Sequence, residues 1–131
     1  MSQENVELVY RAIDALNRRD LDALLALVDD DMEYVSLLAP MEGGYVGHDG
    51  IRRFSENLFA VWPDLIAELL EVRDLGDVMV GAVRLRGHGA GSEIPSDWTV
   101  WHVGRWRRGK CVSIQSFETR DEALEAVGVS E

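Results

Sequence analysis

The amino-acid sequence predicts an α+β fold, with helices on one face of a curved antiparallel sheet. Apolar residues recur at helical spacing in the first half of the chain, whereas residues 78–86 and 98–117 are strand-like. Runs of helices followed by runs of strands are typical of α+β domains whose helices share one side of the sheet. A curved sheet with helices across its concave side encloses a pocket, and such pockets usually take small molecules.

Length, charge and cysteine content narrow the class of protein. The 131 residues suffice for one domain with its own core, and we expect a single domain over residues 1–131. A formal net charge of −11 repels phosphate backbones and anionic membranes, so neither nucleic acid nor membrane is expected as a partner. The lone Cys111 excludes an internal disulfide and fits a reducing compartment. With no signal-peptide pattern and no apolar run of ~20 residues, we expect a soluble cytoplasmic protein.

Two helices are predicted in the first thirty residues. The first has Ser2 as its N-cap and ends at residues 17–19. Its apolar positions are Val6, Val9, Tyr10, Ile13 and Leu16. Asp20 is placed to cap the second helix, which the acidic residues 29–31 are expected to end. The apolar stripe of this second helix comprises Leu21, Leu24, Leu25 and Val28.

A strand and a third helix follow. The strand covers residues 32–38, and alternation places Tyr34, Ser36 and Leu38 on one face. Pro40 ends it, and the glycines at 43–44 predict a loop. The third helix is expected to open at residues 47–50 and to stop at Pro63. Its buried face is predicted to contain Ile51, Phe54, Leu58 and either Val61 or Trp62.

The remaining elements are strands and a short terminal helix. Residues 64–74 are predicted as a strand because the turn at 75–77 leads into the clearer strand at 78–86. Residues 98–117 predict two antiparallel strands joined at the polar turn 107–110. A capping box at residues 119–122 predicts a helix that Gly128 closes.

The hairpin at residues 98–117 carries bulky apolar groups on both faces. Alternation sorts Trp98, His102 and Trp106 onto one face of its first strand and Trp101 onto the other. A sheet with two apolar faces needs cover on both sides. We expect helices of the same chain on one face and a second copy of the protein on the other, through Trp98, His102 and Trp106.

Three segments carry a resemblance to a known family: residues 15–22 at the first helix junction, residues 47–54 opening the third helix, and the ending from 108 to 126. With these, nearly the whole chain resembles the nuclear transport factor two-like superfamily, and within it the SnoaL-like branch named for polyketide cyclases. The resemblance implies a cone-shaped α+β barrel with three N-terminal helices over its concave face, a deep pocket and frequent dimerisation through the outer sheet face. Members include isomerases, cyclases, epoxide hydrolases, dehydratases and binding modules without chemistry, so the fold alone does not assign an activity.

The catalytic positions of the family are altered in this chain. Resemblance to the ketosteroid isomerases places their proton-shuttling aspartate at Ser36, their oxyanion-hole tyrosine at Ala12 and their oxyanion-hole acid at Trp101. The last-strand aspartate of the limonene-type epoxide hydrolases falls at Ser116, and an acid of the cyclases at or near the same position. None of these residues can replace the acid or phenol that it stands for.

Two residues remain as candidate proton carriers. Glu118 would be a catalytic carboxyl group at the rim of an apolar cavity, or else a solvated strand end. His48 would be a general base at the pocket mouth, or else an ordinary loop histidine. The three histidines are isolated in the sequence and lack metal-ligand spacing, so no metal site is expected. The chemistry considered needs no cofactor, and none is expected.

The predicted pocket face supplies the ligand-binding candidates. An inward-facing Arg84 would bind an oxyanion, and an outward-facing one would pair with surface acids. Trp101 would form a flat apolar wall for a ring, or else belong to the core. The full set of ligand-binding candidates is Tyr34, Ser36, Arg84, Trp101, Ile114 and Ser116.

Two functional hypotheses follow. The chain is either an enzyme that performs cofactor-free acid–base chemistry of isomerase, cyclase or hydrolase type on an apolar, ring-containing molecule, or a catalytically silent dimeric module that only binds a ligand or partner. Convergence of Glu118, His48 or an arginine with a hydroxyl on one enclosed cavity would favour the enzyme.

Overall fold

A computed structural model describes residues 2–37 and 43–129 of the chain. The helical part consists of α1 (Ser2–Asn17), α2 (Leu21–Leu25) and α3 (Gly47–Val61), followed near the C-terminus by α4 (Arg120–Ala126). The strands are β1 (Val28–Val35), β2 (Tyr45–Val46), β3 (Ile66–Asp74), β4 (Val78–His88), β5 (Pro95–Arg107) and β6 (Lys110–Phe117). The predicted α+β class is confirmed. Residues 38–42, which include Leu38 and Pro40 of the predicted strand and loop, lie outside the described part.

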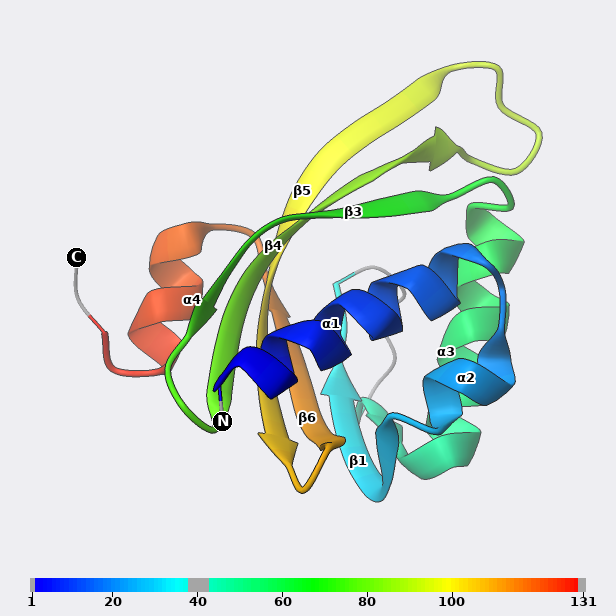
Figure 1. The fold of residues 1–131 in the computed structure, drawn as a ribbon. Coiled ribbons are helices and arrows are strands. Elements are labelled where there is room, and N and C mark those ends of the chain that lie inside the picture. The colour runs from blue at the N-terminus through cyan, green and yellow to red at the C-terminus, as the bar shows by residue number, and fades with distance from the viewer. Residues whose placement is uncertain (1, 38–42, 130–131) are drawn as a thin grey trace.

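The strands form one curved sheet in the order β2-β1-β6-β5-β4-β3. Neighbouring strands are antiparallel except β1 and β6, which run parallel, so the sheet is not antiparallel throughout as the sequence predicted. Helices α1, α2 and α3 lie on the concave side, whereas α4 lies on the opposite side (Figure 1). The main core fills the space between the three N-terminal helices and the concave face. A second, smaller core lies beneath α4 and contains Val80, Val103, Ala123 and Leu124.

Side chains near its C-terminal end hold α1 over the sheet. Asn17 accepts a hydrogen bond from the backbone N–H of Ala67 and donates one to its carbonyl oxygen, each at 2.8 Å. Arg19, in a left-handed backbone conformation with φ of 58°, donates to the carbonyl oxygens of Pro63 and Leu65. These bonds fix α1 to the start of β3, and they fix the height of the helix above the sheet.

The second helix is shorter than the sequence predicted. Asp20 caps it as expected, because its carboxylate accepts a hydrogen bond from the Ala23 N–H. However, Val28 belongs to β1, where it is buried and pairs with Cys111 of β6. The acidic residues 29–31 are therefore part of the strand instead of ending the helix. A register shift in the β1–β6 pairing between Val28 and Glu33 lets these acids reach solvent while Val28 and Met32 stay buried.

The faces of the hairpin differ from the prediction. Its strands form as expected, but the pairing of β5 with β6 shifts by one residue between Arg105 and Trp106. The shift places His102 opposite Ser116, whereas simple alternation from the turn places Trp101 on the face of Ser116. A bulge of this kind moves every later side chain to the other face.

Because of this bulge, the outer interface predicted from the sequence is wrong. His102 and Trp106 line space on the concave side, and Trp98 packs on Trp62 beside α3 with ring centroids 4.9 Å apart. Trp101 instead packs on the convex side against the small core beneath α4. The C-terminal helix of the same chain therefore covers part of the outer face.

Candidate functional site

Two adjoining cavities lie between α1 and the concave face of the sheet. The larger has a volume of about 110 Å³ and the smaller about 90 Å³. Residues that line both are Ala12, Ile13, Val83, His102 and Ile114. Apolar side chains make up most of the lining, and among the described residues none that lines either cavity is charged. Apolar concave sites with a few polar groups are typical of small-molecule binding.

Small residues create this space. Gly81 of β4 and Gly104 of β5 line the smaller cavity without filling it, and Ala12 of α1 faces both cavities. A Cβ atom added to Gly81 would meet its nearest atoms at 3.4 and 3.5 Å, an ordinary contact distance. At Gly104 a Cβ atom would lie 3.3 Å from Nε1 of Trp106, so the indole already occupies part of the space beside that glycine.

Three polar side chains lie close together where β1, β6 and β5 meet on the concave face. Tyr34 lines the larger cavity, and Ser36 and Ser116 are buried near its hydroxyl. Burial raises the pKa of Tyr34 to about 12, although the hydroxyls of Ser36 and Ser116 act in the opposite direction. Tyr34 therefore keeps its proton near neutral pH and can donate a hydrogen bond. The Ser116 hydroxyl is close enough to affect that pKa, but it makes no well-formed hydrogen bond with a described residue.

His102 is the other polar side chain of the cavities. Its ring lies 6.2 Å from that of Tyr34 in an edge-to-face arrangement. Burial lowers the pKa of His102 to about 4, so the imidazole is neutral near pH 7. Its Nε2 atom is shielded from solvent and has no hydrogen-bond partner among the described residues. His102 is partly buried and lines both cavities.

The structure brings together some of the predicted site residues. Tyr34, Ser36, Ile114 and Ser116 gather on the concave side as expected. His102 joins them although the sequence placed it on the outer face. Alternation along β5 keeps His102 on the face of Trp106, as predicted, but pairing from the turn set Trp101 opposite Ser116 and so assigned the face of His102 to the outside. The extra residue of the bulge is Val112 in β6, which the sequence pattern did not reveal; a lone histidine among apolar residues was the available signal.

Other predicted residues lie elsewhere. Arg84 faces outward and forms a two-pronged ion pair with Asp97, at 2.9 and 2.6 Å, which is the alternative weighed from the sequence. Trp101 is on the convex side and cannot form a wall of the concave cavities. Glu118 is exposed just beyond β6, and it lines neither concave cavity.

His48 is also separate from the concave cavities. Its Nε2 lies 2.8 Å from the carbonyl oxygen of Val28 and 3.6 Å from a carboxylate oxygen of Asp30. This position holds the start of α3 against β1. The ring nitrogen that faces Val28 donates its proton to a carbonyl, so it is not placed to act as a base inside the cavities.

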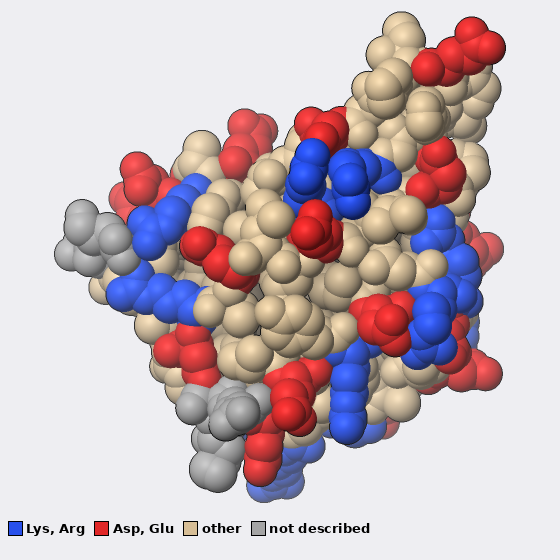
Figure 2. Space-filling model, turned by 45° about the horizontal axis from the view of Figure 1, so that its top comes forward, with Lys and Arg blue, Asp and Glu red and all other residues tan. Residues whose placement is uncertain are grey.

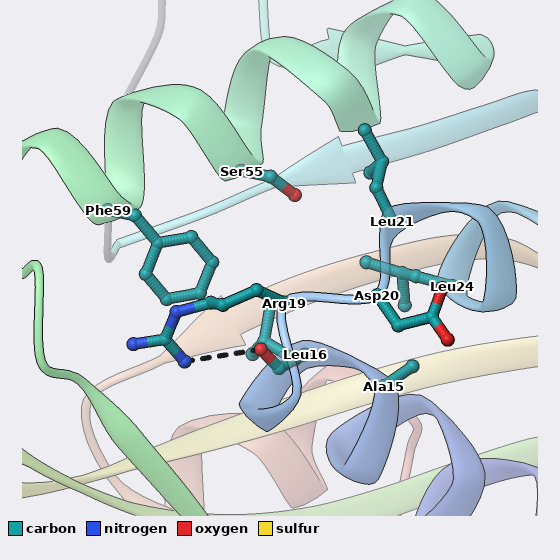
Figure 3. Close-up of a pocket in the computed structure, with 8 residues that line it drawn as sticks. All are labelled: Ala15, Leu16, Arg19, Asp20, Leu21, Leu24, Ser55 and Phe59. Carbon is teal, nitrogen blue, oxygen red and sulfur yellow. Dashed lines mark hydrogen bonds between the residues drawn. The ribbon is translucent and has the colours of Figure 1, made fainter.

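A third and smaller cavity, of about 70 Å³, lies where the α1–α2 junction meets α3 (Figure 3). The guanidinium of Arg19 lies over the ring of Phe59, 3.8 Å from its centroid. Leu16 and Leu24 line this cavity and the larger concave cavity alike. The junction therefore forms the wall between the concave cavity and the surface on this side.

The surface shows no extended area of one charge on the face in Figure 2. Lys and Arg side chains lie among Asp and Glu side chains there. Within the described ranges, no three His, Cys, Asp or Glu side chains gather closely enough to hold a metal ion. No helix in the part of the chain that the structure describes is long and apolar enough to span a membrane.

Comparisons with known proteins agree on the fold. The model of a family described as a SnoaL-like domain matches residues 9–114. No curated protein matches the chain. A cystatin-fold protein from Novosphingobium aromaticivorans is 23% identical with a TM-score of 0.73, over 89% of this chain and 98% of that one.

Two further solved structures contain a bound small molecule. A hypothetical protein with a ketosteroid isomerase-like fold from Catenulispora acidiphila, in complex with trimethylamine, is 19% identical with a TM-score of 0.78, over 95% of this chain and 94% of that one. RV0760c from Mycobacterium tuberculosis, in complex with estradiol-17beta-hemisuccinate, is 17% identical with a TM-score of 0.75, over 90% of this chain and 95% of that one. At such identities the likeness shows the fold alone.

Proposed function

We propose that this chain, which belongs to the SnoaL-like domain family, binds a small apolar, ring-containing molecule in its concave cavities. The observation that carries the proposal is an apolar hollow between α1 and the sheet, with neutral polar groups at one place in its wall. The solved structures in complex with trimethylamine and with estradiol-17beta-hemisuccinate support the proposal, since proteins of this fold hold small molecules in those complexes.

The size of the hollow limits the ligand. Its two parts, of about 110 and 90 Å³, are comparable with the engineered apolar cavity of roughly 150 Å³ that binds benzene. Each part alone is smaller than that cavity, and the two adjoining parts together suit a ligand of one or two small rings. A ligand of steroid size would require α1 to move away from the sheet.

A cavity-filling variant tests the proposal. Ala12 faces both cavities from α1, so Ala12→Phe is expected to fill them and abolish binding of toluene and naphthalene in calorimetry. Ala60 is exposed on α3, and Ala60→Phe serves as the matched control that keeps binding. Equal binding by both variants would show that the ligands lie elsewhere, and no binding by the natural protein would remove the proposal.

Acid–base chemistry on the bound molecule is the second candidate function. The unpartnered Nε2 of His102 favours it, because a neutral imidazole can accept a proton. A pKa of about 4 makes this base weak, so it suits only strongly activated protons, such as those beside a carbonyl group.

Hydrogen exchange tests this second function. The probe is 2-indanone in D₂O, and mass spectrometry follows exchange beside its carbonyl group. Exchange faster than in buffer, and lost in His102→Leu, would support catalysis. Glu118→Gln and His48→Gln test the proton carriers predicted from the sequence, and we expect both to leave exchange unchanged. If exchange were no faster with any of the proteins than in buffer, catalysis would be ruled out and ligand binding would be the only remaining function.

Self-association through the outer sheet face remains a proposal. Exposed apolar side chains at this face support it: Val35 of β1 and Val46 of β2, adjacent in the sheet, are 54% and 57% exposed. Sedimentation is expected to show a dimer in the natural protein and a monomer in Val35→Glu. A natural protein that sediments only as a monomer would remove the proposal.

A further inference from the structure

We propose that His102 and Ser116 form a polar subsite that selects neutral ligands carrying a hydroxyl or carbonyl oxygen. This inference rests on the proposed binding function and adds the chemical class of the ligand. It comes from His102, which lines both cavities and has an Nε2 atom without a hydrogen-bond partner among the described residues, and from Ser116, which lies opposite it and close to the Tyr34 hydroxyl in the cavity wall.

His102 supplies the first half of the subsite. Its Nε2 is shielded from solvent and makes no hydrogen bond with a described residue, while His102 lines both cavities. Leaving such a buried group without a partner is unfavourable. Half a turn about the Cβ–Cγ bond keeps the shape of the imidazole and exchanges nitrogen and carbon positions, so a nitrogen can be presented to a guest.

Ser116 supplies the second half. It lies directly opposite His102 in the pairing of β5 with β6, and its hydroxyl also lacks a well-formed hydrogen bond. His102 and Ser116 therefore adjoin the hydroxyl of Tyr34, and a guest oxygen placed beside them would meet polar side chains on an otherwise apolar wall. A neutral imidazole and a hydroxyl can each donate or accept, so together they suit either a hydroxyl or a carbonyl oxygen.

The surrounding residues select against charge. Among the described residues that line the two cavities there is no Asp, Glu, Lys or Arg. A carboxylate or ammonium group would lose its hydration there without meeting an opposite charge, which is strongly unfavourable. The preferred guest is therefore an uncharged ring with one oxygen function.

Toluene, phenol and benzoate test the subsite by calorimetry near neutral pH. Toluene and phenol have nearly the same shape, so their ratio of dissociation constants isolates the hydroxyl group. We expect phenol to bind at least as tightly as toluene, and benzoate not to bind. In Ser116→Ala and His102→Leu, the dissociation constant of phenol is expected to rise about tenfold relative to that of toluene. This change corresponds to about 1.4 kcal/mol of binding free energy. Toluene binding by each variant shows that the cavity remains open.

Two further variants sharpen the test. Ser113→Ala removes a serine from the same strand, and because Ser113 lines a groove on the convex side, the ratio should not change. His102→Gln restores a hydrogen-bonding side chain and should recover part of the phenol affinity. The subsite would be overturned, with the proposed function intact, if phenol bound the natural protein at least tenfold more weakly than toluene. The same conclusion would follow if the substitutions did not change the ratio of the two dissociation constants. Failure of both toluene and phenol to bind would overturn both.

Discussion

At the scale of single residues, His102 decides the chemistry of the concave cavities. Its place opposite Ser116 follows from the extra residue Val112 in β6, which shifts the pairing between Arg105 and Trp106 and which sequence alternation alone does not reveal. Tyr34 and Ser36 lie beyond the register shift between Val28 and Glu33, and burial alternates regularly from Met32 onward, so alternation placed them correctly on the buried face. The sequence allowed Arg84 to point inward and bind an oxyanion or to point outward and pair with a surface acid. In the structure it points outward and pairs with the carboxylate of Asp97 on the neighbouring strand.

The protonation of His102 can be measured directly. Burial among apolar groups holds its pKa at about 4, well below the ordinary value of 6.5. Titration of the ring proton signals by NMR is therefore expected to give a midpoint below about 5 for this residue. A midpoint near the ordinary value would mean that the ring is hydrated and that the cavity is open to water.

The same burial makes stability depend on pH. Below the ordinary pKa of 6.5, the unfolded chain takes up a proton at this residue that the folded chain refuses until about pH 4. The free energy of unfolding should therefore fall as the pH drops from 6.5 to about 4, by at most roughly 3 kcal/mol from this residue. Denaturant unfolding of His102→Leu should show a shallower decline over this range. Equal slopes for both proteins would contradict the assignment.

At the scale of elements, the helices and strands were largely predictable and their ends were not. The capping residues Asp20 and Thr119 start α2 and α4 as the sequence indicated. The end of α2 was mispredicted because Val28 continues the apolar spacing of the helix. Its burial opposite Cys111 in the sheet outweighs that local pattern. Contacts with a strand more than eighty residues away cannot be seen in a local window of sequence.

The attachment of α1 to β3 gives a prediction at this scale. Asn17→Ala leaves the partly buried backbone N–H and carbonyl groups of Ala67 without partners, so we expect a loss of about 1–3 kcal/mol in unfolding free energy. The control is Asn5→Ala, which removes only an exposed contact of 3.4 Å to Gly76 and should change stability by less than about 0.5 kcal/mol. Denaturant unfolding that shows similar small losses for both would mean that α1 is held mainly by apolar packing.

The N-terminal cap of α4 gives another prediction at the scale of elements. The Thr119 hydroxyl accepts a hydrogen bond from the Glu122 N–H, and the Glu122 carboxylate accepts one from the Thr119 N–H. Thr119→Ala should therefore lower the unfolding free energy by about 1 kcal/mol. Because α4 covers only the convex side, ligand binding in the concave cavities should not change. A loss of binding in calorimetry would show that the two sides of the sheet are coupled.

At the scale of the whole molecule, a curved sheet roofed by helices leaves a hollow on its concave side. The order of helices and strands predicted this arrangement, and the family resemblance agreed with it. The volume of the hollow could not be predicted, because it depends on the height of α1 and on glycines in two neighbouring strands. The sequence also could not show which hairpin face lines the hollow.

The most direct measurement is a crystal structure of the protein soaked with bromobenzene, in which anomalous scattering locates the bromine atom. Binding in the concave cavities predicts a bromine peak between α1 and the sheet, close to Ile13, Val83 and His102, and no such peak in Ala12→Phe. A bromine peak only on the convex side, or none at saturating bromobenzene, would contradict the proposal that the hollow is the functional site.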